Sequence, residues 1–240
     1  MVGTAKFDTS EINTLIRKHW RKEFKNGKSF HYWPMQYPSL NKHCFLFVGL
    51  NPSLKAKDKE TAEFVLESKE SLLDIARMTE IIDKDEEYRG GPDRNKKCGY
   101  PICQEIFREL NKGHKRLESW DYIDLFSNRI LKASDLKKEL DIKDSQEPVS
   151  WPQDESAAKQ LKIFKELLDS LKPKAVLVAN ALASHILIKE MRLEGTKKGY
   201  SSLPSSNVLI FFSSTFSGGH LDVFSRRRLE DQIIRVVKNL

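Results

Sequence analysis

The sequence has few of the features that mark secreted, membrane-bound or metal-binding proteins. Its 240 residues include only three cysteines, Cys44, Cys98 and Cys103, too few and too unevenly spaced for a disulfide framework. No apolar run approaches the ~20 residues of a membrane span. Residues 1–10 lack the apolar stretch of a secretory signal. We therefore predict a cytoplasmic protein with no membrane partner.

Common cofactor and metal motifs are also missing. The sequence contains no Walker phosphate loop, no glycine-rich dinucleotide fingerprint and no helix with paired histidines. Cys98 and Cys103 lie five positions apart without a second pair, which argues against a zinc site. We therefore predict no metal and no cofactor.

The composition is that of a folded, basic protein. Hydrophobic residues make up 39% and aromatic residues 10% of the chain, enough apolar surface to build a core. Lys and Arg number 41 against 34 Asp and Glu, which gives a net charge of +7 and a pI near 9.2. This charge is compatible with a polyanionic partner but does not identify one.

The hydrophobic pattern predicts an α/β protein. Short apolar runs predict buried strands, and amphipathic spacing predicts the helices that separate them. Strands that alternate with helices favour a three-layer α/β/α sandwich with a central, mostly parallel four-stranded sheet. We expect residues 1–42, a helix and an aromatic loop, to pack on a core domain of residues 43–240. The predicted strands are 44–48, 122–126, 175–179 and 208–212, and the predicted helices are 9–24, 61–82, 101–110, 155–171 and 224–238.

Polar residues follow each predicted strand, and ligands bind at the carboxyl ends of strands in open parallel sheets. Asn128 follows the second strand and Asn180 the third, while residues 213–220 follow the fourth. The groups are small or amide-bearing, with no carboxylate pair. They suit hydrogen bonding to a polar, planar ligand better than metal-assisted hydrolysis. The run after the first strand is Gly49-Leu50-Asn51-Pro52-Ser53.

This run after a buried strand resembles the first motif of the uracil-DNA glycosylase superfamily, especially its mismatch-specific and single-strand-selective branches. Tyr100 and the helix after it are similar to the aromatic segment of that family, and the strand ending at Asn128 is similar to its second strand. Residues 213–228 resemble the loop and helix of its second motif, and residues 125–129 also resemble a poorly characterised bacterial branch of the same fold. Three cysteines fall short of the four that hold an iron–sulfur cluster in some branches.

The resemblance implies a monomeric DNA glycosylase-like hydrolase that removes a uracil-like or modified base from DNA. Asn51 would orient a water molecule. Pro52 would stiffen the turn that holds Asn51, and Gly49 would allow the backbone to approach the ligand closely. Asn128 would bond the Watson–Crick edge of a flipped base, with Asn180 as a less favoured reader. Leu50 and Ser53 would contact the substrate from the first turn, and Tyr100 would stack on the base. His220 would donate to the leaving base or to a phosphate, and Arg226 and Arg227 would contact the DNA backbone. The residues that would bind a phosphate are Ser214, Ser217, Gly218 and Gly219.

Structural interpretations remain open for the same residues. The three asparagines could cap turns or helices, Tyr100 could pack in the core, and the glycines and His220 could form an ordinary surface loop. Residues 214–220 contain no proline, whereas the second motif of the family usually reads His-Pro-Ser-Pro or Asn-Pro-Ser-Gly. This departure supports a second hypothesis, a non-catalytic nucleic-acid or nucleotide-binding protein on the same fold. A hydrolase of free nucleosides or nucleotides is a third.

Overall fold

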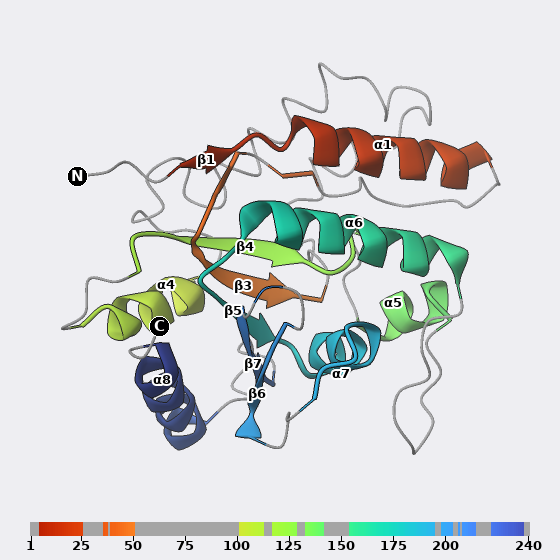
Figure 1. Cartoon of the computed structure of the whole chain (residues 1–240). Helices are drawn as coiled ribbons and strands as arrows, with labels where there is room; N and C mark the ends of the chain where they lie inside the picture. Colours follow the sequence, from red (N-terminus) through yellow and green to blue (C-terminus); the bar gives the residue numbers. More distant parts are fainter. Residues whose placement is uncertain are drawn as a thin grey trace.

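A mostly parallel, five-stranded sheet forms the centre of a mixed α/β protein (Figure 1). The computed structural model describes residues 5–25, 36–37, 39–50, 101–112, 117–128, 133–141, 154–194, 198–203, 206, 208–214 and 222–237. The strand order is β4-β3-β5-β7-β6, in which β6 pairs antiparallel with β7 and the other pairs are parallel. The strands are β3 (Phe45–Gly49), β4 (Trp120–Asp124), β5 (Ala175–Ala179), β6 (Tyr200–Ser202) and β7 (Leu209–Ser213).

The mixed α/β class and the mostly parallel sheet confirm the coarse sequence prediction. The four predicted strands correspond to the four parallel ones of this sheet. The pattern predicts neither β6 nor the two-residue strands at Lys6–Phe7 and Leu40–Asn41. The predicted helix at 61–82 lies outside the described residues. None of the described helices is long and apolar enough to cross a membrane. The helices are α1 (Ser10–Lys25), α4 (Pro101–Leu110), α5 (Ala133–Glu139), α6 (Glu155–Leu171), α7 (Ala181–Glu190) and α8 (Val223–Val237), and a small antiparallel pair is formed by β1 (Lys6–Phe7) and β2 (Leu40–Asn41).

Two groups of helices pack on alternate residues of the central strands. Phe45 and Phe47 of β3 belong to one apolar cluster, with α4 and α8. Leu46 and Val48 belong to the other, with α1, α5, α6 and α7. Because successive side chains of a strand point to opposite faces, these groups cover opposite faces of the sheet. All five residues of β3 are buried, which explains its continuous apolar run.

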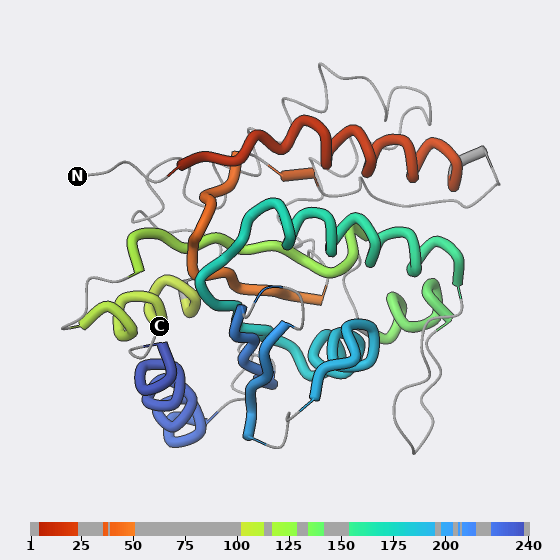
Figure 2. Tube along the Cα trace, viewed as in Figure 1, coloured from red at the N-terminus to blue at the C-terminus, as the bar shows by residue number. Residues whose placement is uncertain are grey.

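A buried polar network joins α1 and α6 to the segment after β4. The indole Nε1 of Trp20 donates to the Oγ of Ser127 at 2.9 Å. The backbone N–H of Ser127 donates to the Oε1 of Gln160 at 2.8 Å. Figure 2 shows α1 running beside α6, so these bonds connect two helices that already pack together. The network fixes the chain just beyond the carboxyl end of β4.

Candidate functional site

The point at which the strand order reverses lies between β3 and β5. From β3 the chain passes to β4 on one side, and from β5 it passes to β6 and then β7 on the other side. The connection after β3 includes α4, on the face of Phe47, whereas α7 follows β5 and packs on the face of Val48 (Figure 1). Connections that leave neighbouring parallel strands toward opposite faces create a ligand-binding crevice at their carboxyl ends. This edge of the sheet is therefore the candidate site.

Four residues form a row across the sheet at this edge. Asp124 pairs with Gly49 in the β4–β3 register, and Ala179 pairs with Ser213 in the β5–β7 register. Val48 pairs with Val178, so Gly49 and Ala179 are neighbours in the same row. All four residues fall on the face covered by α4 and α8, because each lies two positions after a residue of that cluster. We call Asp124, Gly49, Ala179 and Ser213 the carboxyl-edge row.

Gly49 is required by the packing of its neighbours in β4. A Cβ atom at this position would lie 1.9 Å from the Oη of Tyr122 and 2.3 Å from the Oδ1 of Asp124. The Tyr122 hydroxyl donates to that same carboxylate oxygen at 3.2 Å. The sequence predicts that Gly49 permits close backbone approach. Within the described residues, the groups that approach it are the side chains of Tyr122 and Asp124.

Asp124 is the site residue that the sequence analysis missed. Its side chain is only 2% exposed, although it stands at the end of an edge strand. Its backbone is also held, because the Tyr37 hydroxyl donates to the Asp124 carbonyl at 3.1 Å. The predicted second strand ends at 126, two residues later than β4, and therefore places Asp124 in the interior of a strand. The signal was available: a carboxylate interrupting an otherwise apolar run at 122–126.

The first motif leaves the sheet beside this carboxylate. The carbonyls of Gly49 and Leu50 accept hydrogen bonds from the backbone N–H groups of Leu125 and Phe126, both at 3.1 Å. The Leu50 side chain is buried in the cluster of α1 and α6. The chain is therefore fixed up to Leu50, one residue before Asn51.

The two described asparagines make hydrogen bonds within the protein. The Nδ2 of Asn128 donates to the Oε1 of Glu139 in α5 at 2.6 Å, and Asn128 is buried. The Oδ1 of Asn180 accepts from the backbone N–H of Ala183 at 3.1 Å and caps α7. Capping is the alternative interpretation that the sequence left open for Asn180. Asn128 lies four residues beyond the end of β4, so it is not part of the carboxyl-edge row.

Ser214 is half-buried and directly follows β7, next to the carboxyl-edge row. The remaining site residues predicted in the two motifs and the aromatic segment lie outside the described residues. They are Asn51, Pro52, Ser53, Tyr100, Ser217, Gly218, Gly219 and His220.

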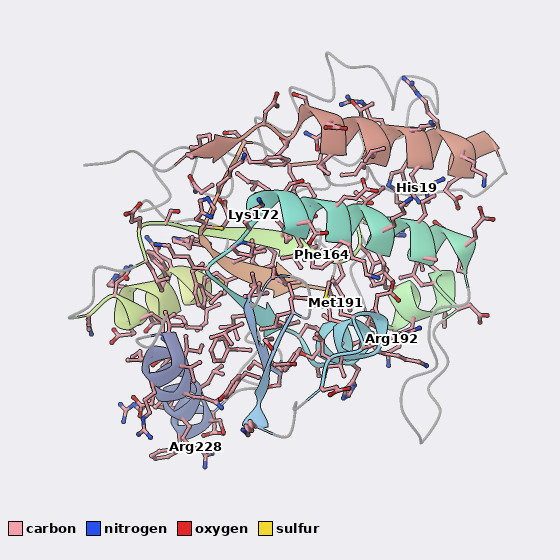
Figure 3. The ribbon with its side chains drawn as sticks, viewed as in Figure 1. His19, Phe164, Lys172, Met191, Arg192 and Arg228 are labelled. Carbon is pink, nitrogen blue, oxygen red and sulfur yellow. The ribbon has the colours of Figure 1, made fainter. Side chains whose placement is uncertain are left out.

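The two arginines predicted to contact DNA have different surroundings in α8. Arg226 forms ion pairs with Glu230, from Nε at 2.8 Å, and with Glu105 of α4, from Nη1 at 3.1 Å. Arg227 is exposed, and so is Arg228, which Figure 3 shows at the outer end of α8. A guanidinium held by two carboxylates is less suited to a phosphate contact than an exposed one. The structure therefore favours Arg227 and Arg228 over Arg226 for contact with an anion.

Among the hollows lined by described residues, two differ greatly in size. A cavity of about 20 Å³ lies between α1, α6 and the end of β4, lined in part by Ile16, Ser127 and Gln160. That volume holds about one water molecule and excludes a nucleobase. A groove of about 540 Å³ runs along α8 beside Arg228 and Arg235. Across the part of the chain that the structure describes, no group of three His, Cys, Asp or Glu residues could hold a metal ion.

Comparison with known proteins does not extend the assignment. Neither a scan against protein-family models nor a search of curated proteins finds a match for this chain. The function is therefore inferred from the geometry of the carboxyl edge and from the sequence motif that begins there at Gly49.

Proposed function

We propose that the protein is a DNA glycosylase-like hydrolase that cleaves the N-glycosidic bond of a uracil-like or modified base in DNA. We further propose that its scaffold is a three-layer α/β/α sandwich whose site lies at the carboxyl edge of the sheet. One observation carries the proposal: the Gly49-Leu50-Asn51-Pro52 motif begins in the carboxyl-edge row, beside the reversal of strand order and a buried carboxylate. Sites in open parallel sheets occur at this point.

The chemistry needs few groups. The bond between the sugar C1′ and the base nitrogen breaks, the electron pair leaves with the base, and a water oxygen adds to C1′ with loss of a proton. In this proposal the Asn51 amide orients that water, which suffices when the sugar is already cation-like in the transition state. The Asp124 carboxylate would stabilise the developing positive charge, because it is buried and its charge is weakly screened.

Base recognition has two candidates. Asn128 offers an amide donor and acceptor, as the family resemblance implies, but its Nδ2 is bonded to Glu139. Asp124 stands at the end of the strand itself, and its carboxylate accepts hydrogen bonds from a base N–H. The position at the strand end favours Asp124, so Asp124→Asn should impair cleavage more than Asn128→Ala does.

The test is a cleavage assay with the purified full-length chain. Labelled oligonucleotides bearing uracil, mismatched thymine or a deaminated purine are incubated with the protein, and abasic sites are revealed by alkaline strand breakage. Asn51→Ala and Asp124→Asn should each lower the rate by about 10²-fold, the usual loss when one stabilising group is removed. Asp135→Asn, an exposed carboxylate in α5, is the matched control and should leave the rate unchanged. No abasic sites across the panel, with folded protein, would contradict the proposal.

A non-catalytic nucleic-acid or nucleotide-binding protein is the second candidate. It is favoured by the missing proline in residues 214–220 and by the exposed arginines of α8. In that case oligonucleotides bind without cleavage, and Asn51→Ala leaves the affinity nearly unchanged. Turnover of free nucleosides without cleavage of oligonucleotides would indicate the third possibility, a small-molecule hydrolase.

A further inference from the structure

One face of α8 carries exposed aromatic and cationic side chains together. Phe224 is 72% exposed and Val223 is 60% exposed, and these are the large exposed hydrophobic residues of the described chain. Arg228 lies four residues after Phe224 and Arg235 lies eleven after it, spacings that place all three on one side of a helix. Both arginines are exposed, whereas Leu229 and Ile233 on the opposite side are buried.

The charge of this face is positive. Arg227, next to the stripe, is also exposed, so three arginines accompany Phe224. Asp231 is the exposed carboxylate among them, and Asp222 precedes the helix. Asp222 caps α8 by accepting hydrogen bonds from the backbone N–H groups of Phe224 and Ser225. We call Phe224, Arg227, Arg228 and Arg235 the α8 arginine face.

A groove runs beside the α8 arginine face. Its volume is about 540 Å³, and its lining residues all belong to α8, among them Ser225, Arg228, Asp231, Gln232 and Arg235. The Nε2 of Gln232 donates to the carbonyl of Lys198, which ties this side of α8 to the segment before β6. Arg228 and Arg235 are seven residues apart, or about 10 Å along the helix axis. Cations at this spacing can contact two phosphates of one strand, on either side of the exposed Asp231 carboxylate.

We propose that the α8 arginine face binds single-stranded nucleic acid, with Arg227, Arg228 and Arg235 on the phosphates and Phe224 stacked on an unpaired base. The proposal rests on the proposed function for its nucleic-acid partner, and it requires no cleavage. A basic surface with an aromatic platform is the usual means of binding single strands. It is distinct from the carboxyl-edge row, because it consists of outward residues of one helix.

Other anionic partners fit the face less well. An acidic peptide supplies charges for the arginines but no regular series of planar rings for Phe224. A membrane surface needs a broad apolar helix face, and the exposed apolar residues of α8 are confined to Val223 and Phe224 at its start. A duplex keeps its bases stacked and inaccessible to Phe224. Single-stranded nucleic acid is the partner that uses both the charge and the ring.

The experiment is a binding titration of the full-length chain with fluorescent DNA and RNA oligonucleotides at several salt concentrations. Arg228→Ala/Arg235→Ala should weaken binding at least about tenfold at low salt and reduce the slope of log K against log salt by about 1.4, two contacts of 0.7 each. Phe224→Ala should weaken binding about tenfold and leave the salt slope unchanged, because stacking releases no counterion. Phe224 is exposed, so this variant is expected to fold, which circular dichroism verifies.

Lys159→Ala/Lys162→Ala is the matched control. It removes two exposed cations from α6, on the opposite face of the sheet, and should bind like the wild type. The proposal is overturned if the α8 variants bind as tightly as this control. It is also overturned if duplex DNA, polyglutamate or phosphatidylglycerol vesicles bind as tightly as the single strands.

Asn51→Ala separates this proposal from the proposed function. If the chain cleaves no oligonucleotide but binds single strands through the α8 arginine face, the cleavage chemistry is wrong and the binding surface stands. If Asn51→Ala abolishes cleavage while the α8 variants bind normally, the surface is wrong and the proposed chemistry stands.

Discussion

Replacement of Gly49 by alanine tests the packing at the carboxyl-edge row. The added methyl group would lie 1.9 Å from the Oη of Tyr122 and 2.3 Å from the Oδ1 of Asp124, far inside van der Waals contact. The Tyr122 hydroxyl is the far end of a long side chain and can rotate away. The Asp124 carboxylate is short and 2% exposed, so it cannot move without disturbing its neighbours. Gly49→Ala should therefore destabilise the fold.

The cost has two parts. Overpacking in a well-filled region costs about 1–3 kcal/mol. Displacement of the Tyr122 hydroxyl breaks its 3.2 Å hydrogen bond to the Asp124 carboxylate, which adds about 1–2 kcal/mol. We expect a loss of about 3 kcal/mol in the free energy of unfolding. For a chain of this length, that lowers the Tm by about 6–12 °C.

The assay is thermal denaturation followed by circular dichroism, with Tyr122→Phe as the second arm of a double-mutant cycle. Tyr122→Phe removes the oxygen at 1.9 Å, and the nearest ring carbon then lies 2.8 Å from the new methyl group. The loss in the free energy of unfolding of the double variant should be about 1 kcal/mol smaller than the sum of the two single losses, because both substitutions affect the same contact. A Tm for Gly49→Ala within about 1 °C of the wild type, or strictly additive losses, would refute the reasoning.

Three further predictions concern the supports of the site. Asp121 is buried and accepts hydrogen bonds from the backbone N–H and Nδ2 of Asn41 at 2.6 and 2.9 Å, so Asp121→Ala should cost about 2–5 kcal/mol in urea unfolding and Asp121→Asn less than half of that. A cost below about 0.5 kcal/mol for Asp121→Ala would show that these bonds do not support the sheet. Trp20→Phe removes the Nε1 donor to Ser127 and should cost about 1–2 kcal/mol. Ser127→Ala should cost more, because the Ser127 Oγ also donates to the Oε1 of Gln160 at 2.9 Å, and the double variant should lose less than the sum of the two; full additivity would count against the network. The hydrogen bonds from Ser225 lower the pKa of Asp222, so the carboxylate cap should stabilise α8 above the usual Asp range and lose its effect as the pH falls through the lowered pKa. An NMR titration of the Asp222 carboxyl group should give a midpoint below about 3.9, and a midpoint at or above that value would contradict the cap.

Elements with a strong, self-contained pattern could be predicted from the sequence to the residue. The buried run of β5 and the amphipathic spacing of α6 occur in the structure with the predicted bounds, Ala175–Ala179 and Glu155–Leu171. The same is true of α4, which begins at a proline. In these segments the residues that the fold buries are the apolar residues that the sequence pattern identifies.

Two of the elements that the sequence does not predict, β6 and α5, carry no such pattern. Strand β6 has three residues, Tyr200–Ser202, of which two are serines, and it is defined by antiparallel pairing with β7 alone. Helix α5 has seven residues, Ala133–Glu139, too short for helical periodicity to stand out. Both depend on tertiary contacts, β6 on its pairing with β7 and α5 on the packing of Leu136 in the core, and one sequence does not reveal such contacts.

The site was harder to predict than the fold because it depends on where each strand ends. The apolar run at 122–126 continues past the end of β4 at Asp124, since Leu125 and Phe126 are buried in the core beneath α1 and α6. The apolar pattern therefore places the end of the second strand two residues too late, so that Asn128, and not Asp124, is predicted as the polar residue beyond that end. The register pairs Asp124 with Gly49, so Asp124 is the polar side chain beside the first motif, whereas Asn128 lies four residues beyond the end of β4.

Gly49 illustrates why a motif cannot be assigned a role from its residue type. The family resemblance requires a small residue for a ligand that comes close, whereas the packing of Tyr122 and Asp124 requires one whether or not a ligand binds. Loss of activity in Gly49→Ala would therefore be compatible with both explanations. Asp124→Asn separates them, because it keeps the shape of the side chain and removes its charge. A large loss of cleavage with little loss of stability would assign Asp124 to the chemistry, and parallel losses of both would assign the pair to packing.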